Sequence, residues 1–352
     1  MAVTRRIVVL TEGQTDPENA KTASCMIRYR PEEMVAIFDA TQRGKTSQEL
    51  LGVGGTLPVI GSLDDAPGAN TLLLGTAPAG GKIPPTWRSV ILEAISRKMT
   101  IWSGLHDFLG NDVEFTTAAQ KYGVELIDVR KNQEHDVASR RGLRDDCFRI
   151  HTVGHDCSIG KMVASVELVR GLTKKGHDAK FIATGQTGIM VEGDGCPIDC
   201  VVADFVAGAV EKLVLKNQHH EILVVEGQGS LVHPSYSGVT LSLLHGCAPH
   251  GLILVYEVGR TRVTDVEHIA IPPLAEIRRI YEVMANVNVD FRCRVLGIAM
   301  NSRRLSESEA TAERQRVKVE FNLPVCDVIR HGPDELVEAV LRFKESGEWQ
   351  KR

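Results

Sequence analysis

A glycine-rich run in the middle of the chain contains the residue types of a phosphate-binding loop. The apolar residues 148–153 precede it, and residues 163–172, whose apolar positions have helical spacing, follow it. The run itself reads Gly154, His155, Asp156, Cys157, Ser158, Ile159, Gly160, Lys161 and Met162. In a strand, glycine loop and helix of this order, backbone N–H groups and the helix dipole surround a phosphate, and the lysine adds a full charge. We therefore predict that this run binds the phosphates of a cofactor; the alternative is a plain turn with a lysine that binds nothing.

Two details of the run narrow its chemistry. Five residues separate Gly154 from Gly160, where the common pattern has four. With Asp156 in the second spacer position, the loop resembles that of dethiobiotin synthetase and related amide-forming enzymes. Lys161 is followed by Met162, and not by the serine or threonine whose hydroxyl would hold Mg²⁺. Because a thioether is a poor Mg²⁺ ligand, we expect a site that contains no metal ion.

Further polar candidates stand where apolar runs end. Glu226 and Asn301 each follow such a run directly, and Gln186 and Thr187 lie between two glycines shortly after another. Ligands of open α/β sheets gather at the carboxyl ends of the strands, so we expect these side chains near the glycine loop. Glu226 would act as a general base or a metal-holding acid, or else cap a helix. Asn301 would bind the edge of a nucleobase, and Gln186 and Thr187 an anionic substrate, unless these residues only form turns.

Apolar runs that alternate with helical stretches predict parallel sheets covered on both faces. The fold class is therefore α/β. We expect a Rossmann-like parallel sheet domain at residues 1–140, followed by a P-loop NTPase-like doubly wound α/β domain at 141–352. The first turn, residues 11–17, lacks G-x-G-x-x-G, so dinucleotide binding is not expected there. Asp39, at the end of the second apolar run, would meet a ribose hydroxyl or, more simply, cap the next turn.

Composition excludes several classes of protein. The 352 residues are 43% hydrophobic with a net charge of −4, and no basic stripe suggests a nucleic-acid partner. No apolar run reaches the roughly 20 residues that span a membrane, and no signal peptide is evident. The eight cysteines are scattered, which is typical of reduced thiols in a cytoplasmic protein. Cys196 and Cys200 are close enough for a zinc site, but no second ligand pair follows, so we predict no metal.

Several motifs occur together in a characteristic order. They are Gly-x-Asp-Cys-x-x-Gly-Lys-Met at 154–162, Thr-Gly-Gln-Thr-Gly at 184–188, Val-Glu-Gly-Gln-Gly-Ser-Leu at 225–231, Leu-His-Gly at 244–246 and Glu-x-Gly-Arg at 257–260. As a set they resemble the family that includes D-glutamate N-acetyltransferase. Its members pair a Rossmann-like domain with a P-loop domain similar to dethiobiotin synthetase, and the resemblance covers nearly the whole chain. His155 stands where this family commonly has threonine.

The resemblance implies that an acetyl group passes from acetyl-CoA to a D-amino acid, with D-glutamate the leading substrate. The amine must lose a proton, so a base is required. We expect Glu226 and Lys161 to be catalytic, with His233 and His245 as further candidates for the base. Arg260, Gln186 and Thr187 would then bind the substrate, since a guanidinium grips a carboxylate through two hydrogen bonds.

Two other functions are compatible with the same residues. One is an ATP-dependent ligase that activates a carboxylate with Mg²⁺, which Lys161 and Glu226 would serve and Met162 opposes. The other is a non-catalytic sensor of nucleotide or CoA. In each case the partner is a small molecule, without nucleic acid or membrane, and we expect a homo-oligomer.

Overall fold

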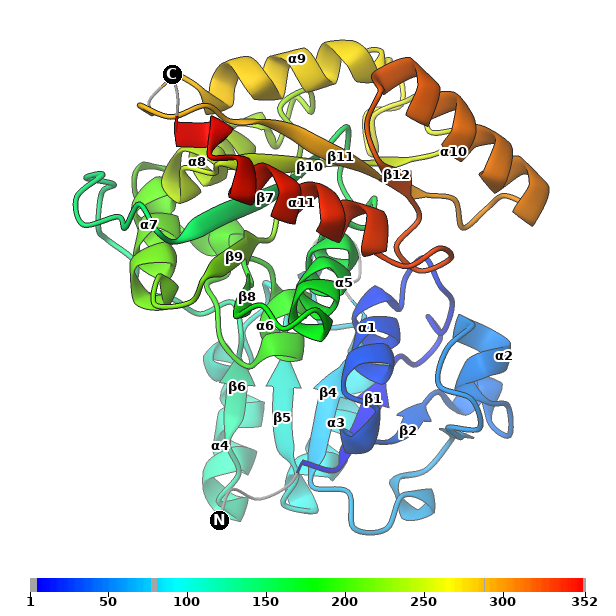
Figure 1. Cartoon of the computed structure of the whole chain (residues 1–352). Helices are drawn as coiled ribbons and strands as arrows, with labels where there is room; N and C mark the ends of the chain where they lie inside the picture. The colour runs from blue at the N-terminus through cyan, green and yellow to red at the C-terminus, as the bar shows by residue number, and fades with distance from the viewer. Residues whose placement is uncertain (1–4, 77–80, 288, 351–352) are drawn as a thin grey trace. The chain divides into compact units, whose positions relative to one another are not determined.

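The computed structural model describes residues 5–76, 81–287 and 289–350. The chain divides after Lys131 into two compact units, and the short stretch 189–193 groups with the first of them. Each unit contains one six-stranded sheet (Figure 1). The ladders between neighbouring strands of both sheets are parallel. The predicted α/β fold class, Rossmann-like and then P-loop, is therefore confirmed.

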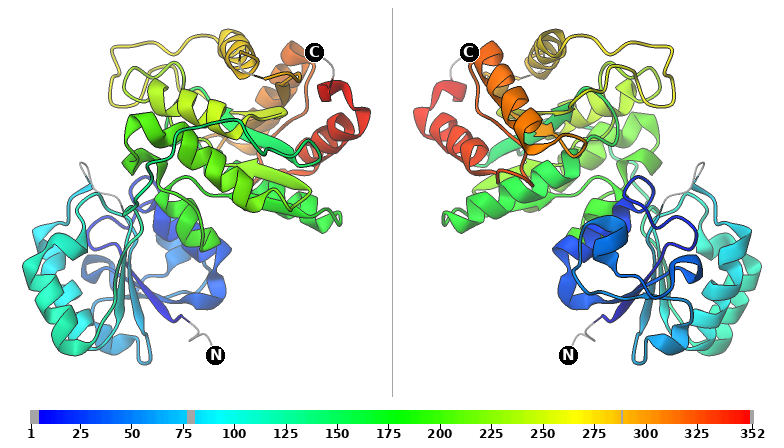
Figure 2. Two further views of the ribbon diagram at one scale, coloured as in Figure 1. Left: turned by 90° about the vertical axis from the view of Figure 1, so that its left-hand side faces the viewer. Right: turned by 90° about the vertical axis from the view of Figure 1, so that its right-hand side faces the viewer.

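The first unit is an open sheet with the strand order of dinucleotide-binding folds. In sequence its strands are β1(Ile7–Leu10), β2(Met34–Phe38), β3(Val59–Ile60), β4(Thr71–Leu74), β5(Thr100–Ser103) and β6(Leu126–Asp128), and its helices are α1(Lys21–Tyr29), α2(Ser47–Leu51), α3(Arg88–Ser96) and α4(Val113–Tyr122). The order across the sheet is β3-β2-β1-β4-β5-β6. Helices α3 and α4 cover one face, and α1 and α2 lie on the other (Figure 2). The two-residue strand β3 is too short to leave a periodic signal in the sequence, so it could not be predicted.

The turn after β1 is filled by its own polar side chains. The Thr15 hydroxyl lies 2.8 Å from that of Thr11 and donates a hydrogen bond to Asp39. The Asp39 carboxylate also accepts from the backbone N–H of Thr41 at 3.0 Å and from its hydroxyl at 2.6 Å. Asp39 is fully buried. It therefore caps the turn after β2, as the simpler expectation had it, and does not face outward to a ribose.

The second unit is a larger sheet with a helix after most strands. Its strands are β7(Phe148–Gly154), β8(Ala179–Ile182), β9(Ile222–Val225), β10(Gly251–Glu257), β11(Arg294–Asn301) and β12(Val325–Cys326), and its helices are α5(Lys161–Lys174), α6(Gln186–Glu192), α7(Val206–Asn217), α8(Ser237–Cys247), α9(Leu274–Ala285), α10(Glu307–Phe321) and α11(Asp334–Ser346). The order is β12-β11-β10-β7-β9-β8. Apolar side chains of α5 and α11 pack on one face, and those of α7, α8, α9 and α10 on the other. Because both faces are covered, the strands are largely buried and mostly apolar, although β7 also contains the buried polar residues Arg149, His151 and Thr152.

The polar segment that leads from β6 to β7 is held against helix α7. The buried Glu211 carboxylate accepts from the backbone N–H groups of Ser139 and Arg140, both at 2.8 Å. The Asn132 side chain donates to the carbonyl of Cys200 at 2.9 Å. Hydrogen bonds that its backbone donates to a buried carboxylate thus order a segment whose sequence has no apolar periodicity.

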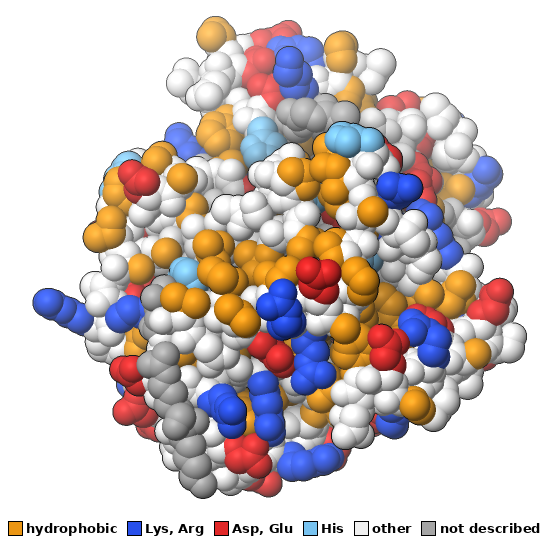
Figure 3. Space-filling model, turned by 90° about the horizontal axis from the view of Figure 1, so that it is seen from above, with side chains coloured by type: hydrophobic (Ala, Val, Ile, Leu, Met, Phe, Trp, Pro, Cys, Tyr) orange, Lys and Arg blue, Asp and Glu red, His pale blue; other side chains and the backbone are white. Residues whose placement is uncertain are grey.

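None of the described helices is long and apolar enough to cross a membrane. On the face shown in Figure 3, acidic and basic side chains are interspersed around a band of hydrophobic ones. This face shows no extended basic surface of the kind that binds nucleic acid.

Candidate active site

The glycine-rich loop joins the central strand β7 to helix α5. Ser158 and Gly160 adopt left-handed backbone conformations, with φ of 55° and 106°. Such reversals turn successive N–H groups toward one concave side, which is the geometry of an anion-binding nest. Among the described residues no side chain caps the start of α5 at Gly160. The loop therefore presents a helix N-terminus that its own protein leaves open.

Lys161 lies inside this loop. Its side chain is buried, and Nζ donates a 2.7 Å hydrogen bond to the carbonyl of Asp156. Burial lowers the pKa of the Lys161 ammonium to about 8. The neighbouring strand end comes very close here, because a Cβ on Gly227 would lie 1.8 Å from the Thr152 carbonyl and 3.1 Å from Cδ of Lys161. Only glycine fits at that position.

Asp156 and Arg260 hold the loop from one side. The fully buried Asp156 carboxylate accepts from the Thr264 hydroxyl at 2.7 Å and from the Arg260 guanidinium at 3.0 Å. Arg260 also donates to the Cys157 carbonyl at 2.9 Å and pairs with Glu257. Hydrogen bonds to Asp156 lower its pKa despite the opposing effect of burial. Both terminal nitrogens of Arg260 are thus engaged within the protein, whereas the sequence led us to assign this residue to a substrate carboxylate.

Three more side chains brace the loop rather than line it. His155 Nε2 accepts from the Glu257 backbone N–H at 2.9 Å, and burial lowers the histidine pKa to about 3, so the ring is neutral. Asn301 donates to the Ile159 carbonyl at 3.1 Å, which ties its amide to the loop itself. The hydroxyl of Tyr281, on α9, donates to the Gly154 carbonyl at 2.9 Å. Tyr281 could not be singled out from the sequence, because one tyrosine on an amphipathic helix resembles any core residue.

Glu226 stands at the carboxyl end of β9, the strand next to β7. It is 4% exposed, and its Oε2 accepts the backbone N–H groups of Thr184 at 2.9 Å and Gly185 at 3.2 Å. Its Oε1 accepts from the Gln228 side chain at 3.2 Å. Burial raises the pKa of Glu226 to about 7, although the N–H donors and the Lys161 charge act in the opposite direction. Glu226 therefore holds the turn between β8 and α6, and its pKa is raised into the neutral range.

Gln186 and Thr187 begin helix α6, although the glycines on either side of them are typical of a turn. Both are partly exposed. The glycine that follows them is required by close packing, since a Cβ on Gly188 would lie 2.4 Å from Oε2 of Glu226. The two polar side chains thus start from the same edge as Glu226.

The two histidines suggested as bases have other contacts. In the buried His233, Nε2 donates to the Thr264 carbonyl and Nδ1 accepts from the Ser235 N–H, both at 3.1 Å. His245 lies in the last turn of α8 and contacts the Met284 carbonyl at 3.3 Å. The helix α8 begins near the loop edge of the sheet, and His245 lies about 12 Å further along its axis, given a rise of roughly 1.5 Å per residue. The structure therefore does not bring His245 to the loop, because the helix carries it toward the other end of the sheet.

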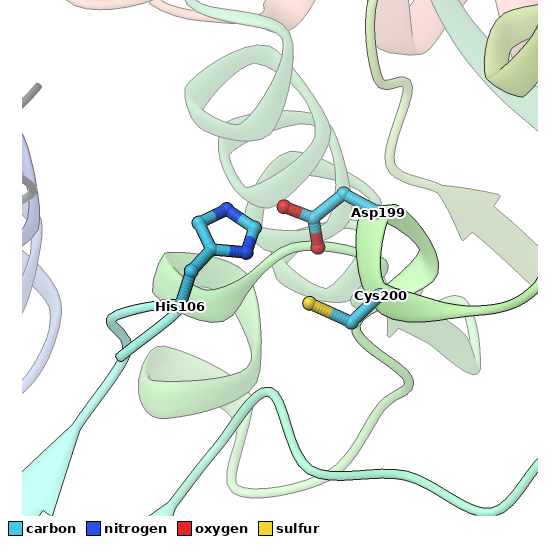
Figure 4. A group of neighbouring side chains, drawn as sticks. All are labelled: His106, Asp199 and Cys200. Atoms are coloured by element: carbon cyan, nitrogen blue, oxygen red, sulfur yellow. The ribbon is translucent and has the colours of Figure 1, made fainter. Parts of the chain in front are cut away.

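The cysteine pair noted in the sequence consists of a buried residue, Cys196, and a partly exposed one, Cys200. Asp199 and Cys200 project from a single turn, the 3₁₀ helix Ile198–Cys200 (Figure 4). Cys196 is buried, which raises the pKa of its thiol to about 12. Atoms of Asp156, Cys157 and His233 also lie within 4.8 Å of one another, but the carboxylate and the ring already have the hydrogen-bond partners described above.

Comparison with known proteins identifies the family. The P-loop domain of unknown function DUF1611_C matches residues 136–337, and the Rossmann-like DUF1611_N domain matches residues 40–132. A D-glutamate N-acetyltransferase of Tritonibacter scottomollicae is 40% identical over 280 residues, covering 78% of this chain and 82% of that protein. An enzyme of the same name from a Pseudoalteromonas species is 37% identical over 271 residues, covering 77% and 81%. A crystal structure of a DUF1611 family protein from Anabaena variabilis has a TM-score of 0.90 at 38% identity, covering 96% of this chain and 99% of that one. The chain therefore belongs to the DUF1611 family, in agreement with the resemblance drawn from its motifs.

Proposed function

We propose that this protein is an N-acetyltransferase that moves the acetyl group of acetyl-CoA to the amine of a D-amino acid, with D-glutamate as the first substrate to test. The observation that carries the proposal is the 40% identity, over most of both chains, to an enzyme named for this reaction. An enzyme of the acyltransferase class is the conclusion that this relationship supports. The geometry of the loop and of Glu226 supports the finer assignments below.

The phosphates of CoA are assigned to residues 154–162. The open start of α5, the left-handed residues Ser158 and Gly160 and the ammonium of Lys161 suit an anion. Met162 offers no hydroxyl for Mg²⁺, and gripping the pyrophosphate of CoA requires none because no phosphoryl group is transferred. Lys161 would exchange its hydrogen bond to the Asp156 carbonyl for one to a phosphate oxygen.

Glu226 is assigned as the general base. The neutral amine nitrogen attacks the thioester carbonyl, the new C–N bond forms, and the C–S bond breaks to release the CoA thiolate. The proton lost by the amine passes to the Glu226 carboxylate and then to the departing sulfur or to water. A base is most effective when its pKa lies near the working pH, as that of Glu226 does at about 7.

The substrate carboxylates are assigned to Gln186 and Thr187. These side chains directly follow the turn that Glu226 holds, so an amino acid bound to them would hold its amine near the base. Arg260 and His233 serve the site indirectly, because their hydrogen bonds fix the segment around Thr264 against the loop.

The reaction is tested with pure protein, acetyl-CoA and D-glutamate, by following free thiol and identifying N-acetyl-D-glutamate by mass spectrometry. We expect release of one thiol per N-acetylated product, and a slower rate with L-glutamate. A panel of D- and L-amino acids with no thiol release would contradict the proposal. Mg²⁺-dependent ATP hydrolysis would instead favour the carboxylate-activating ligase, and tight CoA binding without turnover would favour the sensor.

We also propose a cytoplasmic homo-oligomer. Six of the cysteines, Cys147, Cys157, Cys196, Cys247, Cys293 and Cys326, are free thiols, as expected in a reducing compartment. Exposed valines on α9 and α10, Val283 and Val319 among them, offer apolar surface to a second copy. Light scattering coupled to gel filtration measures the oligomeric state.

A further inference from the structure

Arginines that follow β11 lie across the loop from Glu226. In the strand order, β9 is on one side of the central strand β7, and β10 and then β11 are on the other. Glu226 follows β9, Glu257 ends β10, and Arg303 comes two residues after the end of β11. Along the carboxyl edge, the proposed base and Arg303 therefore stand on opposite sides of the phosphate loop.

Cations outnumber carboxylates on the β10–β11 side. The buried Glu257 carboxylate pairs with Arg260, and Nη2 of Arg303 lies 3.5 Å from its other oxygen. Arg260 also donates a hydrogen bond to the Asp156 carboxylate. Lys161 lies in the same loop as Asp156 and donates to its carbonyl. Three arginine side chains, those of Arg260, Arg303 and Arg304, thus lie within 4.0 Å of the Glu257 carboxylate. An excess of buried and half-buried positive charge is best balanced by an anionic ligand.

Arg303 is placed to reach such a ligand. Among the described residues, Glu257 is the one carboxylate that its side chain contacts, at the long distance of 3.5 Å, and the side chain is 34% exposed. Arg304, at 3.6 Å from the same carboxylate, adds to the positive potential at this point. The backbone N–H of Arg303 donates to the Asn301 side chain at 3.3 Å, and Asn301 in turn holds the loop. The guanidinium is therefore anchored beside the loop while one face remains open to solvent.

We propose that Arg303 binds the 3′-phosphate of CoA, an inference that rests on the proposed function. The thioester must lie near Glu226 for proton transfer, and the pyrophosphate is assigned to the loop. The adenosine end, with its remaining phosphate, must then extend to the other side, over β10 and β11. A guanidinium can grip a phosphate through two parallel hydrogen bonds, so Arg303 distinguishes acetyl-CoA from a donor that lacks this phosphate.

The test compares acetyl-CoA with 3′-dephospho-acetyl-CoA in calorimetric titrations of the full-length protein. Wild type should prefer acetyl-CoA by about tenfold or more, the effect of losing a charge-assisted hydrogen bond. Arg303→Gln should lose this preference by weakening acetyl-CoA binding, with the dephospho form bound within about twofold of wild type. Arg303→Lys should keep part of the preference, since it retains the charge. The matched control is Arg316→Gln on α10, an arginine that also binds carboxylates but lies elsewhere, and it should leave both affinities unchanged.

The possible results distinguish a failure of the Arg303 assignment from a failure of the proposed function. Equal wild-type affinities for the two forms, or an Arg303→Gln variant that weakens both alike or neither, would overturn the assignment of Arg303 while leaving CoA as the ligand. Wild-type protein that binds neither form would overturn the proposed function itself. Thermal unfolding of Arg303→Gln within a few degrees of wild type establishes that the variant is folded.

Discussion

The two sheets of this protein have the same kind of turn at their first strand, and the two turns are filled differently. After β1, the hydroxyls of Thr11 and Thr15 and the carboxylate of Asp39 bond to one another. After β7, the loop that ends at Gly160 leaves the start of α5 without a capping side chain among the described residues. We call the first turn closed, because these side chains fill it, and the second turn open, because no described side chain caps the helix that follows it.

The difference follows from residue types and not from topology. Threonine and aspartate can satisfy backbone and hydroxyl groups locally, so a turn rich in them needs no ligand. Glycine provides left-handed backbone and no side chain, and Lys161 provides a charge whose ammonium donates a hydrogen bond to a carbonyl of the loop. The position of a turn at the carboxyl edge of a sheet indicates where a ligand can bind, while its side chains decide whether one does.

The largest expected effect is loss of turnover when the base next to the open turn is removed. Glu226→Gln should lower kcat by about 100-fold or more, the usual contribution of general-base catalysis, with little change in CoA affinity. The Gln228 amide can turn to meet the new NH₂ group, so the capping hydrogen bonds to Thr184 and Gly185 are kept. Steady-state thiol release measures the effect.

The matched control is Glu211→Gln. Glu211 has the same 4% exposure as Glu226 and also accepts two backbone N–H groups, but it lies on α7 against the segment between the domains. Its variant should lose stability and keep kcat. Near-normal turnover in Glu226→Gln would remove Glu226 as the base and leave the reaction class standing.

The next effect concerns ligand binding in the open turn itself. Lys161→Met should weaken binding of acetyl-CoA by about 1.5–3 kcal/mol, the range for a hydrogen bond to a charged group. Lys175→Met is the control, because it removes an exposed lysine that pairs with Glu338 near the far end of the same helix. Calorimetry measures both. An unchanged affinity in Lys161→Met would show that the loop does not hold the cofactor phosphates.

The open turn and its flanking strand and helix could be predicted from the sequence, whereas the distant residues that contact the turn could not. The spacing from Gly154 to Lys161 is local, so it placed the loop, the strand before it and the helix after it correctly. Tyr281 and Thr264 contact the loop from more than 100 residues away, and no local pattern reveals such contacts. The place of His245 at the far end of α8 could not be predicted for a related reason, because nearness to Glu226 along the chain does not say in which direction a helix carries a side chain.

A third prediction is a change in affinity with pH. Phosphate favours the protonated form of Lys161, whose pKa is lowered to about 8 in the free protein. As pH rises above about 8, free Lys161 loses its proton, and the Kd for acetyl-CoA should increase by up to about tenfold per pH unit. Lys161→Met should remove this dependence. A Kd of the wild type that is constant from pH 7 to 9.5 would show that Lys161 does not titrate in this range.

A fourth prediction is that Mg²⁺ matters little. Met162 replaces the hydroxyl that would hold the ion, so acetyl-CoA affinity should change by less than about twofold between excess Mg²⁺ and EDTA. Met162→Ser provides a contrast, because it restores the missing hydroxyl and should increase the effect of Mg²⁺ on ATP binding. Abolition of acetyl-CoA binding by EDTA would favour the ligase alternative.

The smallest effect on ligand binding should come from the closed turn. Thr15→Val keeps the shape of the side chain and removes its hydrogen bonds to Thr11 and Asp39, which leaves the buried carboxylate with Thr41 alone. Unfolding of the first unit should then become easier by about 1–3 kcal/mol, the cost of a buried group that loses a partner. The Kd for acetyl-CoA should stay within about twofold of wild type, since the first turn has no assigned role in binding. Urea unfolding and calorimetry separate the two effects. If the variant lost acetyl-CoA affinity as strongly as Lys161→Met does, the first turn would also be part of the ligand site. The filling of a turn by side chains would then not be what distinguishes the two turns.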